Sequence, residues 1–173
     1  MRKKMISIFA LLFPVVLLAG CASVYQPQPN QPKATFGIKD EAFFSNTNGV
    51  EIFDNPIDCT GMRFLSRTMA FTGRPVTIDA NKLTTIIVNH LTMDEGAVFT
   101  VSFYPKPNRH YSLVMIDTPV ENKANLFEDS LAIYDGNKYV PIVKRNFVEG
   151  FISGSCHLDE KTMKKLLALK RQS

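Results

Sequence analysis

The chain has 173 residues, of which 45% are hydrophobic and 21% charged, and its formal net charge at pH 7 is +4. This length suits one domain with short extensions, because domains commonly hold about 100–150 residues. Arg2, Lys3 and Lys4 form a basic cluster before an apolar run, and apart from them 17 basic residues face 16 acidic ones. The near-neutral remainder argues against a nucleic-acid-binding protein, whose surface would be strongly basic.

Residues 1–20 have the organisation of a secretory signal peptide. The basic cluster is followed by the run 5–18, which is almost entirely apolar, and then by small residues. A membrane-spanning helix needs about 20 apolar residues, so this run of 14 is too short to span a bilayer. We therefore expect residues 1–20 to be a cleaved leader that directs export.

The leader ends in Leu18-Ala19-Gly20-Cys21, which resembles the lipobox of bacterial lipoproteins at all four positions. The resemblance implies that the Cys21 thiol receives diacylglycerol, that the leader is cut before Cys21, and that the new amino group is acylated. The acyl chains, palmitate among them, would fasten a mature chain of 153 residues to a membrane, at about 0.8 kcal/mol per buried CH₂. By the same resemblance, Ala22 implies the periplasm-facing leaflet of the outer membrane.

Residues 21–33 are expected to be a lipidated N-terminus and tether. Pro27, Pro29 and Pro32 alternate with polar residues, a composition that favours extended polyproline II and cannot form a core. At about 3.1 Å per residue the twelve residues 22–33 would span at most roughly 37 Å. The interpretation is a spacer that holds the domain off the membrane, and a docking peptide for a partner is the alternative.

Two cysteines remain once Cys21 is assigned to lipid. Cys59 and Cys156 lie near the two ends of the expected domain, and disulfides persist in an exported, oxidising compartment. A bridge between them would close a loop of almost 100 residues and remove about 4–5 kcal/mol of denatured-state freedom in the chain-entropy model. The alternative is a reactive thiol beside His157, but adjacent residues on an extended chain point to opposite faces. We expect a structural disulfide.

Residues 34–157 are expected to form a mainly β domain, an antiparallel β-sandwich. Asp135-Gly136 predicts a tight hairpin turn because glycine adopts positive φ readily. Pro141 cannot donate to a ladder, which predicts an edge strand or a bulge. Residues 40–45 fit either a helical turn or an extended lead-in. The expected strands are 61–71, 76–79, 83–91, 97–104, 111–117, 131–134 and 138–143.

Two of these strands have patterns that predict their surroundings. In 97–104 apolar residues alternate with a more polar set, with Val101 and Phe103 on one face, which predicts a half-buried strand. The run 113–116 is apolar on both faces, which predicts a central strand.

Residues 158–173 switch to helical periodicity and are expected to form a short C-terminal α-helix. Asp159 is a good N-cap, and Glu160 lies in the first turn, where the helix dipole favours it. The apolar stripe is expected to comprise Met163, Leu166 and Leu167, continued by Lys170. Either the basic helix contacts acidic lipid headgroups, or the stripe packs on the sandwich with its lysines in water. We favour packing.

Motifs for chemistry are absent from the sequence. His90, His110 and His157 have no spacing that would put two metal ligands on one element. General acid–base catalysis needs carboxylates about 5–9 Å apart across a gap, whereas the acidic pairs here are adjacent in sequence. Those pairs are Asp40-Glu41, Asp94-Glu95, Glu128-Asp129 and Asp159-Glu160. We expect no enzymatic activity, no cofactor and no metal.

Aromatic residues are the remaining candidates for a site. In a chain without tryptophan they are more often core than the lining of a ligand cleft. The aromatics considered are Phe43, Phe44, Phe53, Tyr104, Tyr111, Tyr134 and Tyr139.

These observations favour a lipid-anchored, non-enzymatic binding or adaptor module with a protein partner in the bacterial envelope. The general plan is similar to lipid-anchored β-sandwich subunits of type VI secretion systems, which implies an accessory role in such an assembly. One alternative is a small-ligand carrier or sensor with a cavity between the sheets, lined by tyrosines. A second is a hydrolase or metalloenzyme, which would need two histidines and a carboxylate in contact.

Overall fold

The structure, a computed structural model, describes residues 23–39, 47–65, 75–91, 96–119, 127–148 and 154–172. The predictions on the leader, Cys21, residues 40–45, and the second half of the expected strand 61–71 lie outside these residues. Within the described part, no helix is both long and apolar enough to cross a membrane.

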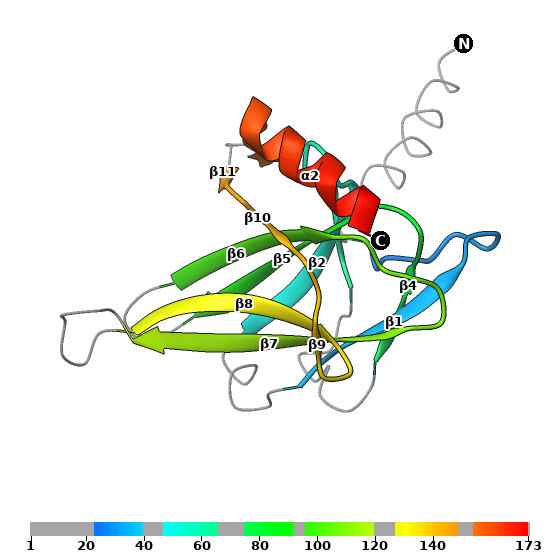
Figure 1. Ribbon diagram of the computed structural model, residues 1–173, viewed down its shortest axis with the longest axis horizontal. Coiled ribbons are helices and arrows are strands. Elements are labelled where there is room, and N and C mark those ends of the chain that lie inside the picture. Colours follow the sequence, from blue (N-terminus) through cyan, green and yellow to red (C-terminus); the bar gives the residue numbers. More distant parts are fainter. Residues whose placement is uncertain are drawn as a thin grey trace, which may run out of the picture.

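Twelve strands and one helix make up the described chain (Figure 1). They are β1 (Lys33–Ile38), β2 (Thr47–Asn55), β3 (Thr60–Phe64), β4 (Val76–Asp79), β5 (Thr84–Leu91), β6 (Gly96–Phe103), β7 (His110–Pro119), β8 (Phe127–Asp135), β9 (Lys138–Tyr139), β10 (Val143–Arg145), β11 (Phe147–Val148), β12 (Ser155–Cys156) and α2 (Glu160–Gln172).

Ten of the strands form two five-stranded sheets that lie over one another (Figure 1). Their strand orders are β4-β1-β7-β8-β9 and β10-β6-β5-β2-β3. The prediction of a mainly β, sandwich-like fold with one C-terminal helix is confirmed. Among the named strands as the structure describes them, pairing is antiparallel except between β1 and β7, which run parallel. As predicted from the run 113–116, β7 is the central strand of its sheet.

Apolar side chains from both sheets fill the space between them. Phe36 of β1 and Phe103 of β6 are both fully buried, with ring centroids 6.1 Å apart. Tyr111 of β7 meets Phe103 edge-on at 5.5 Å. Leu113 and Ile133 contribute from the neighbouring strands β7 and β8. Burial of this area is the main favourable term for folding, at about 25 cal/mol per Å².

The second face of β6 differs from the half-buried prediction. Val101 and Phe103 face the core as expected, but Thr100 and Ser102 are also buried. Arg145, on the neighbouring strand β10 of the same sheet, pairs with Thr100 and donates to Ser102 and to the carbonyls of the β2–β3 turn. Covering by this side chain and that turn, rather than the strand's own pattern, therefore accounts for the burial of this face.

Arg145 is a buried cation held by neutral oxygen atoms. Its Nη2 donates to the Ile57 carbonyl at 2.5 Å, and its Nη1 donates to the Pro56 carbonyl at 3.2 Å and to Ser102 at 3.4 Å. Desolvation by burial lowers the pKa of Arg145. The side chain fixes the turn between β2 and β3 to the outer face of the sheet.

The expected strand 138–143 is wrong as a single strand. Lys138 and Tyr139 pair with β8 in one sheet, whereas the chain from Val143 pairs with β6 in the other. Pro141 lies at the crossing, where its missing N–H costs no ladder hydrogen bond. The predicted Asp135-Gly136 hairpin is present, and Gly136 has φ of 61°.

Helix α2 packs on the sandwich beside β10 and β6. Thr162 N–H donates to the Asp159 carboxylate at 2.6 Å, so Asp159 is the N-cap, as predicted. The predicted stripe is partly wrong, because Leu166 and Leu169 are buried whereas Leu167 is 53% exposed. The buried pair contacts Leu83 and Val143. The apolar stripe is therefore used in packing within the domain.

The predicted disulfide is present. Cys59 and Cys156 are bonded, with Cα atoms 5.2 Å apart and 97 residues apart in sequence. The bridge ties the turn after β2 to β12, and Phe53 and Phe147 pack around it with ring centroids 5.5 Å apart. A separate small core thus lies under the C-terminal segment.

Candidate functional site

The N-terminal segment before β1 is attached to the domain. Val24 forms a parallel bridge with Phe64, the last residue of β3. Tyr25 N–H donates to the Phe64 carbonyl at 2.8 Å. The stretch 21–33, interpreted from sequence as a spacer, is therefore attached to the sandwich at Val24, Tyr25 and Lys33.

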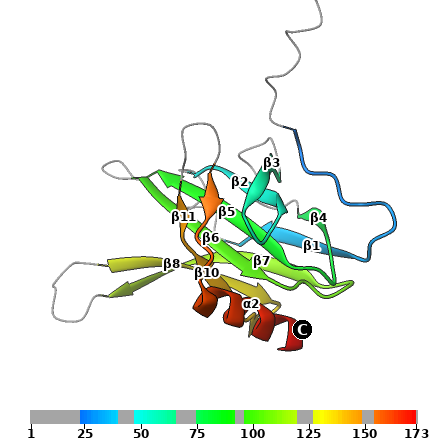
Figure 2. The ribbon, with the colours of Figure 1, turned by 90° about the horizontal axis from the view of Figure 1, so that it is seen from above.

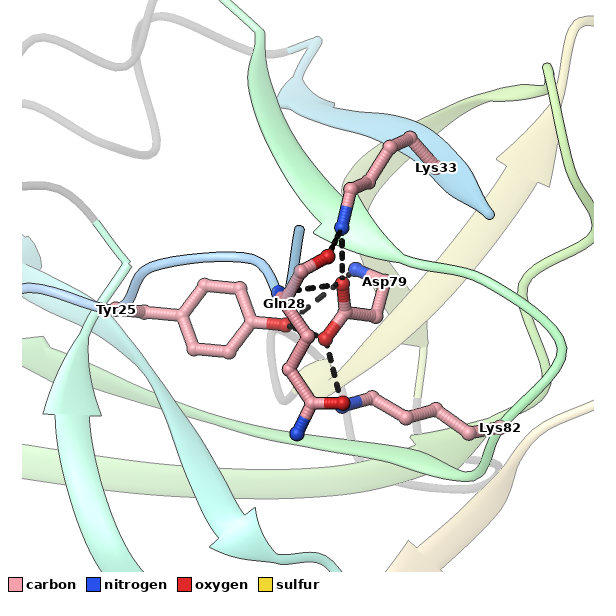
Figure 3. Close-up of polar contacts among 5 residues, drawn as sticks. All are labelled: Tyr25, Gln28, Lys33, Asp79 and Lys82. Atoms are coloured by element: carbon pink, nitrogen blue, oxygen red, sulfur yellow. Dashed lines mark hydrogen bonds and ion pairs between the residues drawn. The ribbon is translucent and has the colours of Figure 1, made fainter. Parts of the chain in front are cut away.

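A single carboxylate, Asp79, gathers this segment onto β4 (Figure 3). Asp79 accepts hydrogen bonds from the Tyr25 hydroxyl at 2.9 Å and the Gln28 N–H at 3.0 Å. It also pairs with the ammonium groups of Lys33 at 2.8 Å and Lys82 at 2.7 Å. Lys33 in turn donates to the Gln28 carbonyl. We call these five residues the Asp79 latch.

The protonation states within the latch are fixed by its contacts. Burial alone would raise the pKa of Asp79, but hydrogen bonds from Lys33, Lys82 and Tyr25 outweigh it and hold that pKa below its ordinary value. Burial, followed by the hydrogen bond to Asp79, raises the pKa of the Tyr25 phenol. Both carboxylate oxygens are occupied by donors, so the ionised group serves as an anchor for the segment.

The latch joins the two sheets along one side of the sandwich. Phe64 belongs to the edge strand β3 of one sheet, and Asp79 belongs to the edge strand β4 of the other. The opposite side is closed by the chain that passes from β9 to β10. Figure 2 shows the N-terminal segment, in blue, entering beside β3 and away from α2.

A surface cleft of about 250 Å³ lies on that opposite side, where β9 and the last turn of α2 meet. Its walls combine aromatic and cationic side chains, and we call it the tyrosine cleft. The residues that define it are Tyr104, Tyr111, Tyr139, Lys106, Arg109 and Lys138.

The polar groups of the tyrosine cleft are only partly paired. Lys106 N–H donates to the Tyr111 hydroxyl at 2.8 Å. Arg109 Nε lies 3.5 Å from the Asp135 carboxylate, which is the one acidic group in the lining. Burial raises the pKa of both Tyr104 and Tyr111, so both phenols stay protonated and can donate.

The aromatic candidates divide between core and cleft. Phe53 packs against the disulfide, and Tyr111 is both buried and part of the cleft wall. Tyr139, by contrast, is 56% exposed, and Tyr134 supports it edge-on at 6.1 Å. Phe43 and Phe44 lie outside the described residues. The interior between the sheets, where the alternative of a small-ligand carrier would place its cavity, is occupied by the buried side chains of the core.

The histidines occupy separate positions in the fold. His110 begins β7, is exposed, and shares a 3.0 Å hydrogen bond with Thr35. His157 follows β12 and is exposed. His90 lies in β5, and its side chain is outside what the structure describes. In the ranges given above, no group of three or more His, Cys, Asp or Glu side chains could hold a metal ion.

Sequence reasoning identified the disulfide pair but missed the latch and the cationic side of the cleft. Tyr25 and Asp79 are 54 residues apart, and no periodicity relates them. The signal that was available is the strand-ending Asp79 in an otherwise apolar setting, since buried carboxylates need partners.

In the part of the chain that the structure describes, fold and site define a disulfide-linked two-sheet sandwich with a latched N-terminal segment and the tyrosine cleft. No family model matches this chain, and neither a curated protein nor a solved structure matches it.

Proposed function

We propose that this protein is a lipid-anchored lipoprotein of the outer membrane, whose β-sandwich is a non-enzymatic binding or adaptor module facing the periplasm. The lipobox-like residues 18–21 supply the anchor. The attachment of the N-terminal segment to β3 supports a particular orientation of the domain relative to the membrane. The disulfide supports an exported, oxidising location.

The attachment of Val24 makes the lipid anchor short. Two residues, Ala22 and Ser23, lie between Cys21 and Val24, and a fully extended chain spans at most about 3.3–3.6 Å per residue, so the three steps from Cys21 to Val24 cover about 10 Å. Acyl chains on Cys21 would therefore hold β3 close to the membrane surface. Strands in a sheet lie about 4.8 Å apart, and β10 is four strands away from β3. The edge of the sandwich at β10, and the tyrosine cleft near it, would therefore face the periplasm.

Mass spectrometry of the protein from its native envelope tests the anchor. The expected N-terminal peptide begins at Cys21 and carries the added mass of acyl chains, and the protein separates with the outer membrane. Cys21→Ser is expected to lose that mass, while Cys59→Ala, which changes a cysteine elsewhere, is expected to keep it. An intact leader or an unmodified Cys21 thiol in the wild type would overturn the proposal.

The adaptor role has a separate test. Affinity capture of the lipidated protein after cross-linking in cells is expected to recover one envelope assembly, such as a secretion system. Recovery of no stoichiometric protein would instead favour a small-ligand carrier or sensor, which the tyrosine cleft supports as the second candidate.

A further inference from the structure

We infer that the tyrosine cleft binds an anionic saccharide, with a sugar ring against the tyrosines and a carboxylate held by the neighbouring cations. The binding chemistry is argued from the cleft itself. The source of the saccharide rests on the proposed function, because the lipid anchor decides which surroundings the cleft meets.

The size of the cleft suits one ring-sized group. Its volume of about 250 Å³ lies just below the range of about 300–1,000 Å³ found for pockets that take drug-sized ligands. Its walls come from β7, β9 and α2 and from the loop between β6 and β7. A site built at the junction of several packed elements is held in place by the fold.

Tyr139 and Tyr104 give the cleft an aromatic surface that suits a sugar, whereas Tyr111 is buried in its inner wall. An aromatic face carries partial negative charge, which attracts the C–H groups of a pyranose, while phenol hydroxyls can bond to its hydroxyls. Tyr139 offers the most exposed ring, and Tyr134 fixes that ring at an interplanar angle of 82°. Tyr104 makes no hydrogen bond through its hydroxyl to any residue that the structure describes, so the group is available to a ligand.

The excess of positive charge in the cleft favours an anionic ligand. Lys106, Arg109 and Lys138 face a single carboxylate, Asp135, which is engaged by Arg109. Neither lysine ammonium forms an ion pair with the carboxylates of the described chain. Cations clustered beside a partly water-excluded surface raise the local concentration of anions. A carboxylate on the ligand would complete this balance.

The position of the cleft favours the cell wall over the membrane as the source. Anionic sugars occur both in lipid headgroups and in peptidoglycan, whose amino sugars carry carboxylate-bearing substituents. Since the N-terminal segment is fixed at β3, the cleft lies on the side of the sandwich away from the lipid anchor. This position makes the cleft more accessible to a glycan in the periplasm than to the headgroups beside Cys21.

Co-sedimentation of the purified, lipidated protein with peptidoglycan sacculi in mild detergent tests the inference. Wild type is expected to pellet with sacculi, and the pelleted fraction should fall with added salt, because the charges are exposed. Tyr139→Ala and Lys138→Gln are each expected to weaken binding about tenfold, which is about 1.4 kcal/mol. The matched control is Lys144→Gln, which removes an exposed lysine of β10 outside the cleft. Equal thermal melting of all variants shows that folding is intact.

Three further probes decide the ligand class. Chitin supplies neutral amino-sugar rings without carboxylates, and binding to it as tight as to sacculi would overturn the anionic assignment. Polyglutamate competing as well as solubilised peptidoglycan would overturn the saccharide assignment. Anionic vesicles bound in preference to sacculi would overturn the cell wall as source. Failure of wild type to bind sacculi would overturn the inference while leaving the lipid anchor, tested by mass, untouched.

Discussion

Asp79 holds a charge where a carboxylate has almost no contact with water, since its side chain is 0% exposed. The desolvation is tolerated because hydrogen bonds from two cations, a phenol and a backbone N–H replace the lost water. The two lysines stay between a third and two fifths exposed, so their own charges remain partly hydrated. Most of the desolvation at this site therefore falls on Asp79, and its removal is the sharpest test of the latch.

Asp79→Asn is expected to lower the free energy of unfolding by about 2 kcal/mol at pH 7, because the amide cannot replace bonds to a charged acceptor. The pKa of Asp79 is lowered by folding from an unfolded value of about 3.9. Its contribution is therefore complete above that value and is lost as pH falls through the folded pKa. Urea unfolding should show a difference between wild type and variant that shrinks below about pH 4.

The matched control for that experiment is Asp54→Asn. Asp54 pairs with Arg63 at 2.6 Å, but both side chains are about two fifths exposed, so the change should cost less than about 0.5 kcal/mol. A difference at Asp79 that persists unchanged at pH 2 would show that lost packing, and not the charge, accounts for it.

Gly154 has no room for a side chain. A Cβ at this position would overlap the ring of Phe147, which packs against Phe53 beside the disulfide. Gly154→Ala is expected to destabilise the protein by about 1–3 kcal/mol through displacement of that ring. In a Phe147→Leu background the same change should cost clearly less, measured as a double-mutant cycle in urea. Additive losses would show that Phe147 is not the obstacle.

At the scale of the element, strand prediction succeeded where alternation and turn residues coincide, as in β4, β5 and β6. It failed at β1, whose residues follow a proline-rich stretch and were assigned in part to the tether. Its parallel pairing with β7 places Phe36 opposite Tyr111 and fully buries Phe36, which no local pattern reveals. It failed again at β2, where Gly49 (φ 146°) and a register shift interrupt the alternation.

In helix α2 one residue of the predicted apolar stripe is wrong: Leu167 is exposed, and Leu169 is buried in its place. Spacings of three and four are both helical, so Leu167 and Leu169 are each compatible with Met163 and Leu166 on one face. The sandwich selects Leu169, because Leu83 and Val143 lie on that side. Periodicity establishes that a face exists, and tertiary packing decides its direction.

The two leucines therefore make a matched pair for mutation. Leu169→Ala is expected to lower the free energy of unfolding by about 2–4 kcal/mol, because it leaves a cavity beneath the helix. Leu167→Ala, at a position 53% exposed, should change it by less than about 0.5 kcal/mol. Circular dichroism during urea unfolding measures both. Equal effects would mean that the helix is not seated by Leu169.

For the whole molecule, composition and patterning were enough to predict a mainly β domain, its closing helix and its disulfide. The assignment of strands to the two sheets could not be predicted from the sequence, because the crossing at Pro141 depends on contacts that only the complete sandwich provides. The cleft could not be predicted for the same reason. Tyr104, Tyr139 and Leu169 meet only after the β9–β10 crossing and the helix are in place.

The disulfide constrains the molecule as a whole, since it connects the turn after β2 to β12 across 97 residues. Closing a loop of that length lowers the entropy of the unfolded chain, and such native bridges commonly contribute about 2–5 kcal/mol. Replacing both Cys59 and Cys156 by Ala is expected to lower the free energy of unfolding by about that amount. Either single replacement should cost nearly as much as the double, because each breaks the same bond.

Reduction separates the effect of the bond from the effect of packing around it. Cys59 and Cys156 are both buried against Phe53, so the alanine variants also lose side-chain contacts. Dithiothreitol added to wild type removes the bond alone, and it should reproduce most of the loss measured for the double variant by urea unfolding. The reductant should leave the double variant unchanged. If reduced wild type proved as stable as oxidised, the second core would be held by packing around β11 and β12, and the bridge would contribute nothing to the fold's stability.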